Sequence, residues 1–118
     1  MKNLQNNFTT PEQSNRLLGL DVPADSADFY YDKDEVEIDE ITHPYILPFN
    51  RKFSNYNDMF YLPCWSVGRL MEICKICEPK KYYEQLCEEL QYSKNYCVVI
   101  ISHIIANLPI IDFSKLED

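Results

Sequence analysis

The hydrophobic pattern of the chain changes period at Trp65, and this change constrains the fold more than any other feature of the sequence. Ser66 is a capable N-cap, and after it apolar residues recur at helical spacing. These positions are Val67, Leu70, Ile73, Cys74 and Cys77. Pro79 ends the segment because a proline cannot continue the hydrogen-bond ladder of a helix. We therefore expect a helix that begins after Ser66 and ends before Pro79.

A shorter helix is predicted near the N-terminus. Residues 1–8 are polar and lack periodicity, so we expect a mobile tail there, followed by a single domain over residues 9–118. Thr10 can cap a helix that has Pro11 at its first position and Gln13 as the capping-box partner. We expect its apolar face to consist of Leu17, Leu18 and Leu20. The stop signals are Gly19 and Pro23.

The segment before Trp65 predicts short strands, since aromatic runs alternate there with turn residues. Phe29, Tyr30 and Tyr31 form an aromatic run with good strand propensity. Val36 and Ile38 alternate with acids, which suggests a β-hairpin arm. Three further predictions are an edge strand at 45–47 between Pro44 and Pro48, a turn at 54–58, and a strand at 59–62 ended by Pro63.

The C-terminal third favours helices, although strand signals compete with them. Residues 80–92 suit one helix face but would also alternate in a strand, and we favour the helix. Residues 95–108 are apolar on nearly every side. Their β-branched residues favour a strand, but we interpret the segment as a buried helix. Residues 109–116 are expected to pack back on the domain. The predicted fold is α+β: an N-terminal helix, a small antiparallel sheet of three to four short strands, and two to three C-terminal helices on one face.

Composition excludes several classes of protein. The chain has 118 residues, 46% of them hydrophobic, and its longest apolar run, residues 97–101, is far too short to cross a membrane. No apolar leader follows Met1, so we expect a soluble, cytoplasmic protein with no membrane partner. Two glycines, Gly19 and Gly68, cannot build a glycine-rich phosphate loop or a dinucleotide fingerprint.

The net charge of −8 is concentrated at the front of the chain. Residues 1–40 hold ten acidic and three basic residues, and the densest acidic stretch is 32–40. Asp34, Glu35 and Glu37 in this stretch could face a basic protein partner or mimic the phosphates of DNA, or they could be a solvated edge that prevents aggregation. Clustered lysines and arginines are few, which disfavours direct nucleic-acid binding.

Three blocks of the sequence carry a resemblance to a family. The blocks are residues 10–18 (TPEQSNRLL), 22–31 (VPADSADFYY) and 62–73 (LPCWSVGRLMEI). They resemble small uncharacterised proteins of phage-like and mobile elements in gut Bacteroides-type bacteria. Such proteins tend to have Leu-Gly-Val-Pro where this chain has Leu20-Asp21-Val22-Pro23. The resemblance implies a bacterial cytoplasmic setting and an accessory role, and it supplies no activity.

Cysteine and histidine are the residues that could carry chemistry. Cys74 and Cys77 form a C-x-x-C that could bind zinc with Cys87, Cys97 or His103, since zinc prefers thiolate and imidazole ligands. The pair lies inside an amphipathic helix, however, so we interpret the cysteines as core residues and predict no metal and no cofactor. His43 lies in a predicted loop and His103 in an apolar run, where a satisfied core histidine is the favoured interpretation. We predict no catalytic residue and no enzyme.

Aromatic residues and the acidic stretch are the remaining candidates for function. Phe60, Tyr61, Pro63 and Trp65 could staple a helix to the sheet or form an exposed patch, and Arg69 could bind an anion or pair with Glu72. The candidate binding residues are Tyr30, Tyr31, Asp34, Glu35, Glu37, Trp65 and Arg69. We expect a non-enzymatic accessory or protein-interaction module with an unknown protein partner, for which a basic protein is a candidate. The alternatives are an acidic DNA-mimic inhibitor of a DNA-processing enzyme and a metal-binding or thiol protein.

Overall fold

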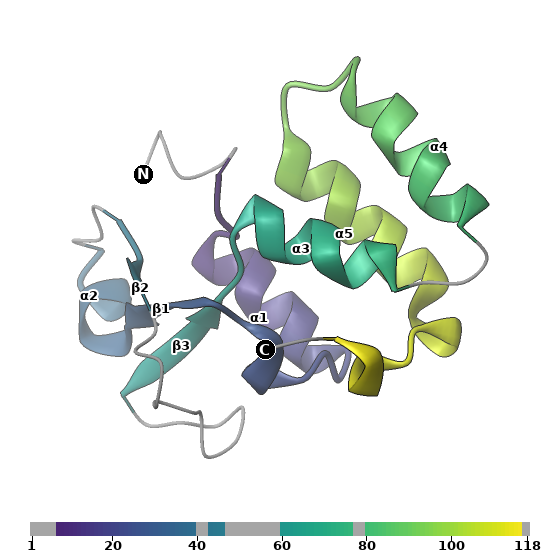
Figure 1. Cartoon of the computed structure of the whole chain (residues 1–118). Helices are drawn as coiled ribbons and strands as arrows, with labels where there is room; N and C mark the ends of the chain where they lie inside the picture. Colours follow the sequence, from purple (N-terminus) through teal and green to yellow (C-terminus); the bar gives the residue numbers. More distant parts are fainter. Residues whose placement is uncertain (1–6, 40–42, 47–59, 77–79, 117–118) are drawn as a thin grey trace.

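The computed structural model describes residues 7–39, 43–46, 60–76 and 80–116, and it is an α+β fold (Figure 1). The elements are α1 (Pro11–Gly19), β1 (Phe29–Asp32), α2 (Lys33–Glu37), β2 (Tyr45–Ile46), β3 (Tyr61–Cys64), α3 (Val67–Lys75), α4 (Lys81–Leu90) and α5 (Tyr96–Asn107). Short 3₁₀ turns occur at Ala24–Ser26, Leu108–Ile110 and Phe113–Lys115. The predicted class is confirmed, with an N-terminal helix, a three-stranded antiparallel sheet and C-terminal helices.

The sheet has the order β2-β1-β3, and both pairings are antiparallel. Tyr30 in the central strand lies opposite Tyr45 of β2 and Pro63 of β3. The strands expected at 29–31 and 45–47 are confirmed where the structure describes them. The strand expected at 59–62 begins instead at Tyr61 and continues through Pro63. An edge strand tolerates this proline because one side of its backbone makes no ladder bonds.

The predicted hairpin arm around Val36 and Ile38 is wrong, because this segment is the helix α2. The Asp32 carboxylate accepts hydrogen bonds from the backbone N–H groups of Asp34 (2.8 Å) and Glu35 (3.4 Å). This N-cap satisfies two of the donors that a helix start leaves unpaired. The cap therefore outweighs the alternation of apolar and acidic residues. The turn expected at 54–58 lies outside the described residues.

Helix α1 confirms the predicted capping box: Thr10 Oγ1 accepts from Gln13 N, and Gln13 Oε1 accepts from Thr10 N. Its C-terminus closes with two backbone bonds, from Asp21 N to Leu18 O and from Val22 N to Leu17 O, both 3.0 Å. These bonds form a Schellman motif, in which Asp21 takes the left-handed conformation with φ 67°. Leu20, expected on the apolar face, is exposed, and Val22 is buried in its place.

The C-terminal helices α3, α4 and α5 confirm the helical interpretation of residues 67–75, 81–90 and 96–107. Helix α5 packs against both α3 and α4 (Figure 1). Its buried side is Cys97, Ile100, Ile101 and Ile104. The tail packs back on the core through Ile111, Phe113 and Leu116, as expected, while Ile110 is half exposed. Cys77 and Pro79 lie outside the described residues.

The segment before α1 is held against the junction of β3 and α3. Thr9 N donates to Trp65 O, Val67 N donates to Asn7 O, each at 2.9 Å, and Phe8 pairs with Ser66 as an antiparallel bridge. The sequence-based boundary placed residues 7 and 8 in a mobile tail, and their backbones are paired here. Residues 1–6 lie outside the described part of the chain.

Candidate interaction surface

Three of the seven candidate binding residues belong to the core. Tyr31, Trp65 and Arg69 are 1%, 0% and 9% exposed. The Trp65 indole Nε1 donates to Ser26 Oγ (3.0 Å), and Trp65 belongs to the same buried core as Leu70 of α3. These side chains organise the fold and offer no surface to a partner.

Arg69 also links α3 to the 3₁₀ turn Ala24–Ser26. Its guanidinium Nε donates to Ser26 O (2.7 Å), and its Nη1 pairs with Glu72 Oε2 at 3.4 Å. The predicted i,i+3 ion pair therefore forms, although the Glu72 side chain is 54% exposed and such a pair contributes little to stability. An anion site at Arg69 would have to displace a buried hydrogen bond to the backbone.

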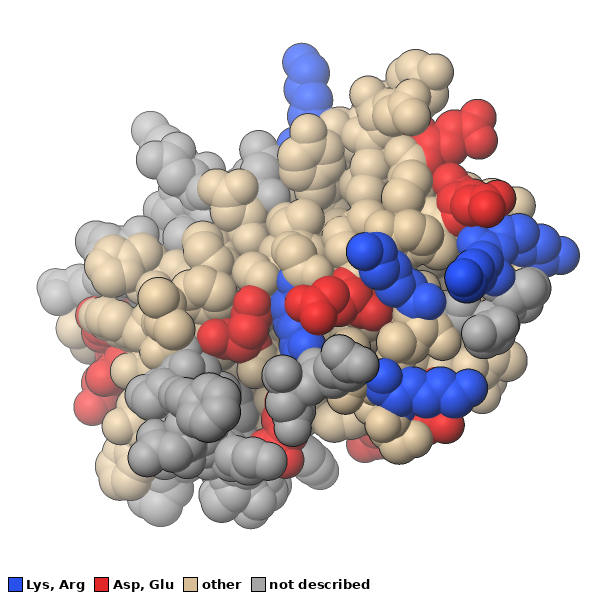
Figure 2. Space-filling view, viewed as in Figure 1, with Lys and Arg blue, Asp and Glu red and all other residues tan. Residues whose placement is uncertain are grey.

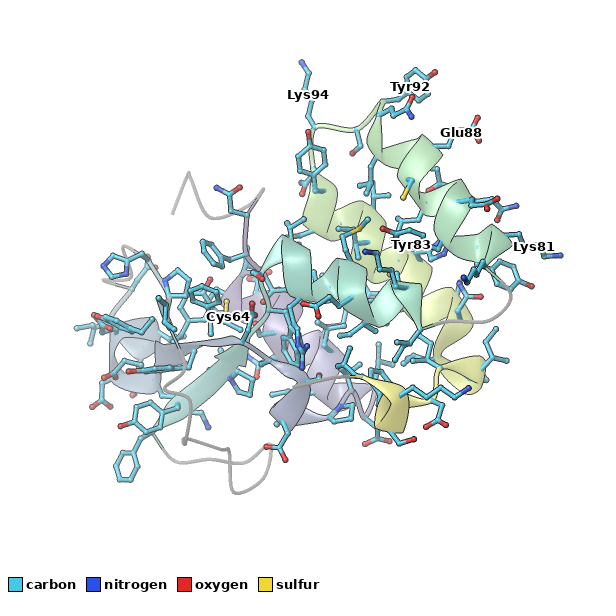
Figure 3. The ribbon with its side chains drawn as sticks, in the orientation of Figure 1. Cys64, Lys81, Tyr83, Glu88, Tyr92 and Lys94 are labelled. Carbon is cyan, nitrogen blue, oxygen red and sulfur yellow. The ribbon has the colours of Figure 1, made fainter. Side chains whose placement is uncertain are left out.

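A buried polar network links Thr9, Ser14, Tyr31 and Cys64. The Tyr31 hydroxyl donates to Thr9 O (2.6 Å), and Thr9 Oγ1 lies 2.8 Å from Ser14 Oγ and 3.6 Å from Cys64 Sγ. Cys64 lies in the interior where β3 runs into α3 (Figure 3). Burial raises the pKa of the Tyr31 hydroxyl and raises the pKa of the Cys64 thiol to about 12. Both groups therefore stay protonated at neutral pH, which makes Cys64 a poor nucleophile.

The other cysteines and the histidines form no metal site among the described residues. Cys74 and Cys97 are buried, as the core interpretation of the cysteines predicts, and burial raises the pKa of Cys97 to about 11. A satisfied core histidine was expected at His103 on α5, but its buried Nε2 has no hydrogen-bond partner among the residues that the structure describes. His43 Nδ1 lies 3.0 Å from Pro44 O.

The outer face of the sheet brings three tyrosines together. Tyr30 and Tyr45 are directly opposite each other, with ring centroids 5.4 Å apart. Tyr61 lies diagonally across from Tyr30, with centroids 4.8 Å apart in an edge-to-face arrangement. His43 contacts Tyr45 (5.1 Å), and Phe60 contacts Tyr61 (6.3 Å). The rings therefore form one continuous aromatic row across all three strands.

Helix α2 borders this row and places its acids beside it. The Tyr45 hydroxyl donates to both carboxylate oxygens of Glu35, at 2.9 and 3.1 Å, and this bond raises the pKa of Tyr45. Lys33 N donates to Phe60 O (2.9 Å), which ties the start of the helix to β3. Asp34 and Glu37 are exposed. We define the aromatic–acidic surface as Tyr30, Tyr45, Tyr61, Phe60, Asp34, Glu35 and Glu37.

The surface is apolar at its margins and negative in charge. Next to the row, Phe60 and Ile38 are 65% and 61% exposed. In the view of Figure 2, carboxylates are spread over both parts of the molecule, whereas most lysines and arginines gather over the helical part. Within the described residues, no carboxylate of α2 forms an ion pair.

Four of the seven predicted residues, namely Tyr30, Asp34, Glu35 and Glu37, thus belong to one surface. The sequence reasoning missed Tyr45, Tyr61 and Phe60 as members. Their grouping depends on strand register and on the helical state of α2, and the only sequence signal was the strand propensity of the tyrosines. On the far side of the molecule, Lys81, Glu88, Tyr92 and Lys94 point outward from α4 and the turn after it (Figure 3).

No family model matches the chain, and neither the curated proteins nor the solved structures provide a match. None of the described helices combines the length and the apolar character that crossing a membrane requires.

Proposed function

We propose that this protein is a non-enzymatic protein-interaction module whose contact surface is the aromatic–acidic surface. The observation that carries the proposal is the continuous row formed by Tyr30, Tyr45 and Tyr61, bordered by exposed Phe60. Tyrosine and phenylalanine are enriched at the centres of protein interfaces, where rigid rings bury a large area at a small cost in side-chain entropy. The three tyrosines are half-buried, and the exposed Phe60 extends their row into solvent, where apolar side chains that lie together are typical of interaction sites.

The setting of this module is also a proposal. The resemblance to proteins of phage-like and mobile elements supports a bacterial cytoplasmic accessory role with neither a membrane nor a direct nucleic-acid partner. The net charge of −8 supports the latter point, because a negative surface repels phosphates.

An acidic inhibitor that mimics nucleic acid is the alternative. A mimic works through spaced, solvated charges, whereas the Glu35 carboxylate is engaged by the Tyr45 hydroxyl and the acids occupy a helix of only five residues. These observations favour the interaction module. Salt dependence combined with the aromatic variants separates the two: a mimic depends on exposed charge pairs, which weaken as ionic strength rises, whereas the module also depends on its aromatic side chains.

The test is a pull-down with the tagged full-length protein from a bacterial lysate at low and high salt. Tyr30→Ala and Phe60→Ala are compared with Tyr92→Ala, a matched control because Tyr92 is 84% exposed and lies on the opposite part of the fold. A partner that survives high salt and is lost with the first two variants supports the proposal. A partner lost at high salt but retained by both variants favours the mimic.

Two further outcomes contradict the interaction module. If Tyr92→Ala alone abolishes capture, the contact surface lies at the turn after α4 and the assignment to the aromatic–acidic surface is wrong. If no protein is captured at either salt concentration, the aromatic–acidic surface is not an interaction site under these conditions and the proposal fails. Urea unfolding of each variant shows whether a loss of capture reflects misfolding.

A further inference from the structure

We infer that the aromatic–acidic surface recognises arginine side chains presented by a basic segment of the partner protein. The inference rests on the proposed function and names the chemistry of the partner. Its starting point is the outer face of the sheet, where ring faces and edges of three tyrosines meet. A guanidinium stacks on such rings because it is planar, weakly hydrated and attracted by the negative face of the ring.

Charge complementarity selects a cationic occupant. Residues 32–39 contain five acids and one lysine. Asp34, Glu35 and Glu37 have no cationic side chain within ion-pair distance in the part of the chain that the structure describes. A partner that brings positive charge to this face would therefore complement the charge of these three carboxylates.

Geometry selects arginine over lysine. Glu35 is half-buried, and its carboxylate is fixed against the sheet because the Tyr45 hydroxyl donates to both of its oxygens. Each oxygen keeps a further lone pair, so the carboxylate can still accept a charge-assisted N–H bond from a guanidinium. The same guanidinium can then stack on the ring of Tyr45 or Tyr30. Lysine offers a compact, strongly hydrated charge that cannot make both contacts at once.

The experiment titrates the ¹⁵N-labelled full-length chain with three synthetic Gly-Ser peptides that differ only in carrying arginine, lysine or neutral citrulline. Amide shifts are followed at Tyr30, Glu35 and Tyr45. We expect the arginine peptide to bind at least about fivefold more tightly than the lysine peptide, and citrulline to cause no shift.

Variants test the role of the fixed carboxylate. Glu35→Gln should weaken arginine binding about tenfold, because the charge-assisted bonds are lost. Tyr45→Phe should weaken it by a smaller factor, since the ring remains and only the hydroxyl that positions Glu35 is removed. Glu88→Gln on α4 removes the same charge elsewhere and should leave binding unchanged. Spectra that overlay away from the substituted position show that each variant is folded.

Equal affinity for the arginine and lysine peptides would overturn the inference, and so would binding that Glu35→Gln does not alter. The failure of the inference is distinguishable from that of the proposed function. If Tyr30→Ala and Phe60→Ala abolish capture of a protein partner while the arginine peptide causes no shift, the surface is an interface and only the arginine specificity is wrong. If neither experiment depends on this surface, both fail.

Discussion

We expect Asp21→Gly to raise the free energy of unfolding, because it relieves backbone strain at the C-terminus of α1. Asp21 follows the C-cap of α1 with φ 67°, a left-handed conformation that costs a residue with a Cβ about 1–2 kcal/mol, and less for Asp or Asn. Its side chain is exposed, so no packing is lost on truncation. Asp21→Gly removes the strain but makes the unfolded chain more flexible. The strain relieved slightly exceeds the added flexibility, so the net expectation is a gain of up to about 0.5 kcal/mol in unfolding free energy.

Urea unfolding followed by tryptophan fluorescence measures this change, because Trp65 is the only tryptophan and is fully buried. A thermal melt should rise by at most about 2–4 °C. Asp21→Ala keeps the Cβ in the strained conformation and should be less stable than Asp21→Gly by about 1 kcal/mol.

Asp25→Gly is the control for charge and flexibility. It also replaces an acid by glycine, but Asp25 lies in the 3₁₀ turn Ala24–Ser26 and has no positive φ. It should therefore lose about 0.5–1 kcal/mol through the entropy of the unfolded chain. The strain argument is refuted if Asp21→Gly is destabilised as much as Asp25→Gly, or if Asp21→Ala is as stable as Asp21→Gly.

Two further predictions concern the buried thiols and the N-cap of α3. Burial raises the pKa of the Cys64 and Cys97 thiols from 9.0 to about 12 and about 11, so the unfolded state loses these protons first and stability must fall as pH rises above 9. Each thiol should contribute a loss of about 1.4 kcal/mol by about pH 10, measured by urea unfolding, and a pH-independent stability would contradict this. Ser66→Ala removes the N-cap bond to Arg69 N and the bond to Asp28, and should cost about 1–2 kcal/mol, whereas Ser66→Asn should keep part of the cap.

The parts of the fold that the sequence predicted are those set by local chemistry. The capping box of Thr10 and Gln13 and the N-cap at Ser66 act over three residues, so their helices start where expected. The sequence reasoning did not predict helix α2, because it relied on the alternation of apolar and acidic residues. It did not take into account that the Asp32 side chain can cap a helix.

The candidate site was predicted only in part because it is assembled by contacts between distant segments. Tyr30 and Tyr31 are neighbours in sequence with equal propensity, and the pleat sends one to the outer face and the other into the core. Which of the two is buried depends on the side against which α1 packs. The contact between Tyr45 and Glu35 also requires a helix that the sequence reasoning did not predict.

The pairing of the N-terminal segment with the start of α3 has a consequence for how the chain acquires its structure. Thr9 Oγ1 accepts from Trp65 N across 56 positions of sequence. Helix α1 has nine residues, too few to be stable alone in water, and it depends on partners that leave the ribosome much later. The N-terminal half should therefore remain unstructured during synthesis until β3 and α3 emerge. Folding then includes the closure of a long loop, whose entropic cost must be met before these contacts form.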